Sequence, residues 1–273
     1  MQKNKNLAYI IVMLLVLTSC GQYQKVLNRG TVEEQYKMAV KMYESQKYSK
    51  ALRLFEKITP SYRGKPQMER IQFMVSQSNF NEKNYSLAGY YFNRFTRNYP
   101  KSSKKEEAAF LSALSYYKAA PRFSLDPTDT DKALESFQGF IDNYPNSDKL
   151  PEANKYYAEL RYKLEKKAFE IAKTYYRTAD YDTRNYRAAI VAFDNLLSDY
   201  LGTSFKEEAL FYRLKAAHDF AMKSTARRKA ERIKSAVKAY DKLKRNFPES
   251  KFMTDSNDML SALQKAQEQL VKS

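Results

Sequence analysis

One spacing of side chains recurs five times along this chain and constrains its fold more than any other feature. Each copy has an alanine, an aromatic residue four positions later and a second aromatic residue seven positions after that, followed in three copies by proline. An alanine and an aromatic residue four apart share one face of an α-helix, where the alanine lets a neighbouring helix approach closely. The second aromatic residue and the proline mark the helix end. The copies are Ala51/Phe55/Tyr62, Ala88/Phe92/Tyr99, Ala133/Phe137/Tyr144, Ala189/Phe193/Tyr200 and Ala236/Tyr240/Phe247.

In the clearest copies a first helix is expected before each of these helices. Ala39 and Ser76 lie twelve residues before Ala51 and Ala88. This is the separation of the small residues on the two helices of a tetratricopeptide repeat, so the chain resembles such repeats. The resemblance predicts an all-α fold, a tetratricopeptide-repeat solenoid of about five irregular helical hairpins over residues 31–273.

Three capping-box sequences mark expected helix starts. In each, a hydroxyl and a glutamate three residues later satisfy free backbone N–H groups. They are Thr31-x-x-Glu34, Ser103-x-x-Glu106 and Ser204-x-x-Glu207.

The repeats are also less regular than the consensus period of 34 residues, so insertions are expected. Pro121–Asp131, with two prolines and three aspartates, has the composition of a loop in the third hairpin. Residues 151–164 predict an additional helical stretch before the fourth hairpin, and residues 222–232 are expected to lengthen the fifth.

The first twenty residues have the pattern of a secretory signal. Lys3 and Lys5 precede an apolar run of eleven residues from Leu7 to Leu17, which is too short to span a bilayer. The run ends in Leu17-Thr18-Ser19-Cys20, which resembles the lipobox of bacterial lipoproteins.

This pattern predicts a signal peptide over residues 1–19 and lipid attachment at Cys20. Residues 20–30 are expected to form a lipidated tether, because residues 21–30 show no apolar periodicity. Because Gly21 and not aspartate follows Cys20, resemblance to known sorting rules favours the outer membrane, with the protein on its periplasmic face.

The composition narrows the possible partners and sites. Cys20 is the only cysteine, which excludes an intrachain disulfide or a cysteine cluster for zinc. Removal of Lys3 and Lys5 lowers the 48 Lys and Arg to 46, against 31 Asp and Glu. Such an excess is typical of nucleic-acid binding, but export argues against a nucleic-acid partner. Acidic proteins, anionic lipid headgroups and a plain solvated surface remain as explanations.

Two stretches in the middle of the chain carry motifs beyond the general repeat. One is Ala133-x3-Phe137-x2-Phe140-x3-Tyr144-Pro145-Asn146-Ser147 after the Asp-rich loop. The other runs from Leu164-Glu165 through Tyr175-Tyr176 to Tyr186-Arg187-Ala188-Ala189 and Leu196-x3-Tyr200. With the lipobox and the five repeats, these motifs resemble the BamD family, lipoproteins of the outer-membrane β-barrel assembly machinery. Leu201-Gly202, where the family usually has proline, and the extra segment Asp180–Asn185 depart from its pattern.

The resemblance implies a scaffold without catalysis and without a cofactor. Its C-terminal repeats would dock on a BamA-like barrel protein, and its N-terminal repeats would receive the terminal strand of unfolded outer-membrane protein clients. Four rings around Ala39 and Ser76 are expected to face such a client: Tyr36, Tyr43, Phe73 and Phe80. Interhelical core is the alternative for each ring. Four cations are expected to dock the partner: Arg227, Arg228, Lys229 and Arg232.

Three other classes of protein compete with this interpretation. A generic periplasmic repeat lipoprotein that recruits cell-wall enzymes would share the lipobox and the repeats. A carbohydrate-binding lipoprotein normally stacks sugars on tryptophan, and this chain has none. An enzyme is the weakest class, because the sequence has no Gly-rich phosphate loop or nucleophile motif, and its one histidine, His218, is expected to be a packing residue.

Overall fold

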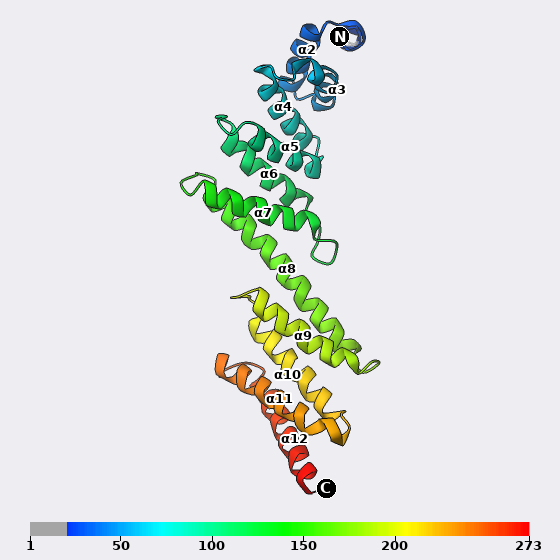
Figure 1. The fold of residues 1–273 in the computed structure, drawn as a ribbon, viewed down its shortest axis with the longest axis vertical. Coiled ribbons are helices and arrows are strands. Elements are labelled where there is room, and N and C mark those ends of the chain that lie inside the picture. Colours follow the sequence, from blue (N-terminus) through cyan, green and yellow to red (C-terminus); the bar gives the residue numbers. More distant parts are fainter. Residues whose placement is uncertain (1–20, 273) are drawn as a thin grey trace, which may run out of the picture. The chain divides into compact units, whose positions relative to one another are not determined.

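The computed structural model describes residues 21–272, which form helices joined by turns and short loops, with no strand among them (Figure 1). The predicted all-α fold of packed helical hairpins is confirmed. No helix within residues 21–272 combines the length and apolar character needed to cross a membrane. The elements are α2 (Val32–Glu44), α3 (Tyr48–Ile58), the 3₁₀ turn η1 (Thr59–Tyr62), α4 (Gln67–Asn81), α5 (Tyr85–Asn98), α6 (Lys105–Ala119), α7 (Thr128–Asn143), α8 (Leu150–Thr178), α9 (Arg184–Asp199), α10 (Lys206–Met222), α11 (Ala226–Asn246) and α12 (Met253–Lys272).

The described chain divides into two compact units. The first comprises residues 21–121 and 127–157 and contains the hairpins α2/α3, α4/α5 and α6/α7, each packed on the next (Figure 1). The second comprises residues 122–126 and 158–272. It contains most of α8, then α9, the hairpin α10/α11 and the terminal helix α12, which packs on α10 and α11.

The repeated alanines and first aromatic residues form the core, as predicted. All five alanines are completely buried, which allows neighbouring helices to approach. The first aromatic residues fill the space between them and are buried to at least 96 %: Phe55, Phe92, Phe137, Phe193 and Tyr240.

The second aromatic residues end their helices in four of the five copies. Tyr99 is the C-cap of α5, and its N–H donates to the carbonyl of Phe95 at 2.9 Å. Tyr144, Tyr200 and Phe247 occupy the same position after α7, α9 and α11. In the first copy the helix ends earlier, at Ile58, and η1 carries the chain to the buried Tyr62.

One of the three predicted capping boxes forms. Thr31 caps α2. Its hydroxyl accepts from the Glu34 N–H, and the Glu34 carboxylate accepts from the Thr31 N–H. Ser103 and Ser204 do not cap α6 and α10, so those two predictions are wrong. The hydroxyls that stabilise these starts lie one residue earlier: Ser102 Oγ accepts from Lys104 N at 3.0 Å, and Thr203 Oγ1 accepts from Phe205 N at 3.2 Å.

A tight turn explains this shift. The N–H of Ser102 donates to the carbonyl of Tyr99, and the N–H of Thr203 donates to that of Tyr200, both at 3.1 Å. Each turn directs the earlier hydroxyl toward the next helix start. The same turn links Ser147 to Tyr144 and Ser250 to Phe247.

The predicted insertions differ in detail from the structure. The loop in the third hairpin ends at Pro127, and Asp129 and Asp131 lie in the first turn of α7, where they complement the helix dipole. The expected extra helix over residues 151–164 is continuous with α8, a single helix of 29 residues. Only Lys223–Thr225 separate α10 from α11, so the fifth insertion is mainly an early start of α11.

The predicted tether also differs from the structure. Residues 21–29 are helical and pack on the first hairpin. Tyr23 is only 5 % exposed, and Val26 and Leu27 contact the same apolar cluster. The absence of apolar periodicity was misleading, because one buried ring and two half-buried side chains are enough to attach so short a helix. The predicted signal peptide and Cys20 lie outside the described residues.

Candidate functional site

The two predicted client-binding rings of the first repeat lie on α2 and are half-buried. The Tyr36 ring packs on Tyr62, with the ring centroids 5.4 Å apart. The Tyr43 hydroxyl donates to Gln77 Oε1 on α4 at 2.5 Å, and its ring meets Tyr48 edge-on. Burial raises the pKa of Tyr43, so this hydroxyl stays protonated and remains a donor at neutral pH.

The two rings of the second repeat lie on α4 and differ from each other. Phe73 is 9 % exposed and packs edge-on against Phe92 and Phe95 of α5, at centroid distances of 5.8 and 5.4 Å. Phe80 is half-buried and lies 5.6 Å from Tyr85. Phe73 therefore belongs mainly to the interhelical core, whereas Phe80 keeps exposed ring surface.

Lysines of the next repeat lie over these rings. Lys104 Nζ is 5.6 Å from the centroid of Phe73, and Lys118 Nζ is 5.9 Å from Phe80 and 5.8 Å from Tyr85. An ammonium group in this position is attracted to the ring face. The first repeats thus combine half-buried aromatic surface with positive charge.

The predicted docking cations begin α11 in the second unit. Arg227 and Arg228 are exposed, and Arg228 Nη1 lies 3.5 Å from Glu231 Oε2. Arg232 is held within the chain, because its guanidinium lies 3.6 Å from the centroid of Phe220 and donates to Ser224 Oγ at 2.6 Å. The first turn of α11 has no acidic residue. Of the four predicted docking cations, Arg227, Arg228 and the half-buried Lys229 therefore carry the positive charge that a partner could contact.

A polar network in the second unit is a feature that the sequence did not predict. The Tyr176 hydroxyl donates to Asp219 Oδ2 at 2.8 Å, and His218 Nδ1 lies 2.8 Å from Asp219 Oδ1. Burial alone would raise the pKa of Asp219, but these two hydrogen bonds hold it below its usual value. Tyr176 and Asp219 are 43 residues apart, so no local pattern could have indicated their contact.

Lys223, the residue directly after α10, makes a second pair of contacts. Lys223 donates to Asp180 and, at 2.8 Å, to the Tyr186 hydroxyl. Asp180 belongs to the segment by which the sequence departs from the BamD pattern. This segment therefore has a structural role in the fourth and fifth repeats. His218 is half-buried, and its Nδ1 contacts Asp219 rather than this segment.

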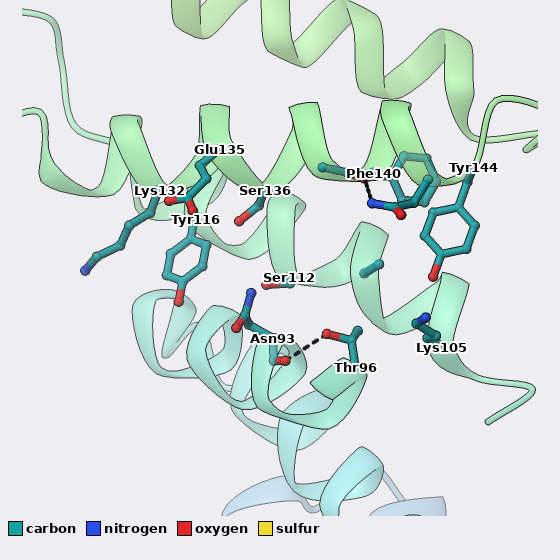
Figure 2. Close-up of a pocket in the computed structure, with 13 residues that line it drawn as sticks. Asn93, Thr96, Lys105, Ser112, Tyr116, Lys132, Glu135, Ser136, Phe140 and Tyr144 are labelled. Atoms are coloured by element: carbon teal, nitrogen blue, oxygen red, sulfur yellow. Dashed lines mark hydrogen bonds between the residues drawn. The ribbon is translucent and has the colours of Figure 1, made fainter. Parts of the chain in front are cut away.

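A cavity of about 540 Å³ lies among α5, α6 and α7 of the first unit. Figure 2 shows Lys132, Glu135 and Ser136 of α7 facing Ser112 and Tyr116 of α6. Its lining is mostly polar and comes from three helices, which is why the sequence did not reveal it. Among residues 21–272, no three His, Cys, Asp or Glu side chains are grouped to hold a metal ion.

Comparison with known proteins identifies a family and several relatives. The family described as outer membrane lipoprotein, YfiO, matches residues 28–233. The outer membrane protein assembly factor BamD of Haemophilus influenzae is 23 % identical over 240 residues, which cover 83 % of this chain and 88 % of the relative. BamD of Pasteurella multocida is 23 % identical over 245 residues, which cover 83 % of this chain and 90 % of that relative.

A third relative gives a longer alignment. The outer membrane protein assembly factor BamD of Caulobacter vibrioides is 22 % identical over 258 residues, covering 93 % of this chain and 80 % of the relative. The family match alone spans well over half of the 273 residues and extends from before α2 into α11. The chain therefore belongs to the YfiO family of outer membrane lipoproteins.

Proposed function

We propose that this chain is a lipid-anchored scaffold in the assembly of outer-membrane proteins and acts by binding, without catalysis. The observation that carries the proposal is the family match over residues 28–233, together with relatives that are named outer membrane protein assembly factors. A solenoid suits this role, because its stacked hairpins offer long, exposed helix faces to several partners at once.

The anchor in this proposal is the lipid on Cys20. Lipidation would hold the first unit at the periplasmic face of the outer membrane, because Cys20 directly precedes the helical residues 21–29. The generic alternative, a repeat lipoprotein that recruits cell-wall enzymes, would have the same anchor and is distinguished by its partners.

The client surface in this proposal is the aromatic face of the first two repeats. Tyr36, Tyr43 and Phe80 are half-buried and offer ring surface, and Phe73 belongs to the core cluster against which Phe80 packs. Extended, apolar segments of unfolded outer-membrane proteins suit such a face, because rings bury large apolar area at little conformational cost. Lys118 adds a positive charge that favours the carboxylate of a terminal strand.

The docking surface for a BamA-like barrel protein is the start of α11. Arg227, Arg228 and Lys229 suit an acidic face on a folded domain, and Arg232 orders the surface through Phe220. Charges at the rim of an interface mainly raise the association rate and make it dependent on salt.

The first experiment is affinity purification from detergent-solubilised envelopes. Recovery of a BamA-like barrel protein would support the proposal. Recovery of cell-wall hydrolases without a barrel protein would contradict it and favour the generic repeat lipoprotein.

Two double variants then test the division of labour. Arg227→Glu with Arg228→Glu should weaken barrel-protein docking and spare client-peptide binding, and Tyr36→Ala with Phe80→Ala should do the reverse. Lys238→Glu with Lys242→Glu is the matched control, because it makes the same charge change at exposed positions further along α11. If both test variants lose the same partner, or if the control weakens docking equally, the assignment of separate surfaces fails.

A further inference from the structure

Five cations surround the helical segment at the start of the described chain. Lys25 and Arg29 project from residues 21–29, and Lys50, Arg53 and Lys57 follow one face of α3 beside it. We call these five side chains the N-terminal collar. The segment lies next to α2 and α3 at the N-terminal end of the first unit (Figure 1).

The collar is held in place by contacts that attach residues 21–29 to the first hairpin. The buried Tyr23 donates its hydroxyl hydrogen to the carbonyl of Lys50 at 3.1 Å. Gln35 Nε2 on α2 is 3.2 Å from the carbonyl oxygens of both Val26 and Leu27. Lys57 Nζ donates to the Leu27 carbonyl at 2.6 Å, where a cation is favourable at the end of a helix.

The charges of the collar are not neutralised within the described chain. None of the five cations forms an ion pair with a carboxylate of residues 21–272, whereas Lys37 on the neighbouring α2 pairs with Glu33 at 2.7 Å. Lys25, Arg29 and Arg53 are exposed. Arg53 is close enough to Tyr23 to lower its pKa, although the larger effect of burial raises it. The collar therefore offers exposed cations that have no ion-pair partner among residues 21–272.

The position of the collar indicates what it meets. The helical segment that carries Lys25 and Arg29 begins directly after Cys20, and consecutive Cα atoms are only about 3.8 Å apart. A lipid on Cys20 would bring a fixed basic surface to the membrane, with no long linker between them. Basic side chains this close to a bilayer are attracted by anionic headgroups, and each Lys or Arg strengthens binding by about fivefold.

We propose that the N-terminal collar binds the anionic phospholipid headgroups of the membrane that carries the anchor. The proposal takes its location from the lipidation of Cys20, and its chemistry from the unpaired cations. Headgroup binding would orient the first hairpin against the bilayer, which a single lipid chain attached to a flexible tether could not do.

The test uses the mature chain with Cys20→Ser, so that no lipid contributes to binding. It should float with vesicles of phosphatidylcholine and phosphatidylglycerol, not with pure phosphatidylcholine, and binding should weaken as ionic strength rises. The variant Lys25→Gln, Arg29→Gln, Arg53→Gln should lower the partition coefficient on the order of a hundredfold, at about fivefold for each cation. These three side chains are chosen because Lys50 and Lys57 also hold the segment in place.

The matched control is Lys234→Gln, Lys238→Gln, Lys242→Gln, three exposed lysines of α11 that give the same change in net charge. It should bind the anionic vesicles nearly as well as the parent. Equal binding to both vesicle types, an unchanged collar variant, or an equal loss in the control would overturn the proposal. A collar variant that floats normally but loses a protein in the affinity purification would show that the collar meets an acidic protein instead. Flotation requires neither lipidation nor a barrel protein, so its failure leaves the proposed assembly function standing.

Discussion

Replacing Gly89 with alanine should destabilise the first unit, although alanine is the better helix former. Gly89 lies inside α5, and a Cβ atom there would be 2.8 Å from two ring carbons of Tyr116 on α6. Tyr116 is 8 % exposed, and Ser112 Oγ of the same helix donates to the Gly89 carbonyl at 2.9 Å. The two helices are thus held together where the extra methyl group would enter, and the ring has to leave its preferred position.

The expected size follows from two opposing terms. Overpacking a well-filled contact costs about 1–3 kcal/mol, and the helix preference of alanine over glycine contributes about 0.5–1 kcal/mol in the other direction. The net loss is about 0–2.5 kcal/mol, and each kcal/mol lowers the Tm by about 2–4 °C in a domain of this size. Thermal unfolding followed by circular dichroism measures this shift.

Gly139→Ala is the matched control. Gly139 also lies inside a helix, α7, but a Cβ atom there would meet nothing within 4 Å. The same substitution should therefore raise the Tm, because only the helix preference changes. In a Tyr116→Leu background, Gly89→Ala should lose its penalty. The reasoning is refuted if Gly89→Ala raises the Tm as much as Gly139→Ala does, since α5 and α6 would then not approach as closely as the structure shows.

Three further predictions concern the core, the polar network and the anchor. Ala88→Leu and Ala133→Leu should each destabilise by about 1–3 kcal/mol, because both positions are completely buried; unchanged melting of both variants would show that the repeat register is wrong. The folded pKa of Asp219 lies below its unfolded value. Its charge therefore stabilises the fold at neutral pH, and this contribution is lost as the pH falls below about 4 through the folded pKa. The free energy of unfolding of Asp219→Asn should accordingly approach that of the parent in acid, and a pH-independent difference would contradict this. Cys20→Ser should abolish labelling with radioactive palmitate, and a variant that still labels would rule out Cys20 as the attachment.

The sequence by itself determined the features that depend on neighbours along the chain. An alanine and an aromatic residue four apart must share a helix face, so Ala88 and Phe92 could be assigned to the core. Thr31 and Glu34 are three apart, so their reciprocal cap is a local event as well. These relations repeat along the chain, and the helical hairpins follow from them.

The tertiary structure decided whatever depends on contacts between distant segments. Phe73 and Phe80 are seven residues apart, so the sequence places them on the same face of α4. In the structure, α5 buries Phe73 and leaves Phe80 half-exposed. The network of Tyr176 and Asp219 joins residues 43 positions apart. Residues 21–29 form a helix because the first hairpin buries Tyr23. Gln35 of that hairpin also donates to the carbonyls of Val26 and Leu27, near the end of the helix. The physical reason is the same in each case: burial and hydrogen bonding depend on what another helix brings to the contact, and side-chain spacing along one helix carries no information about that.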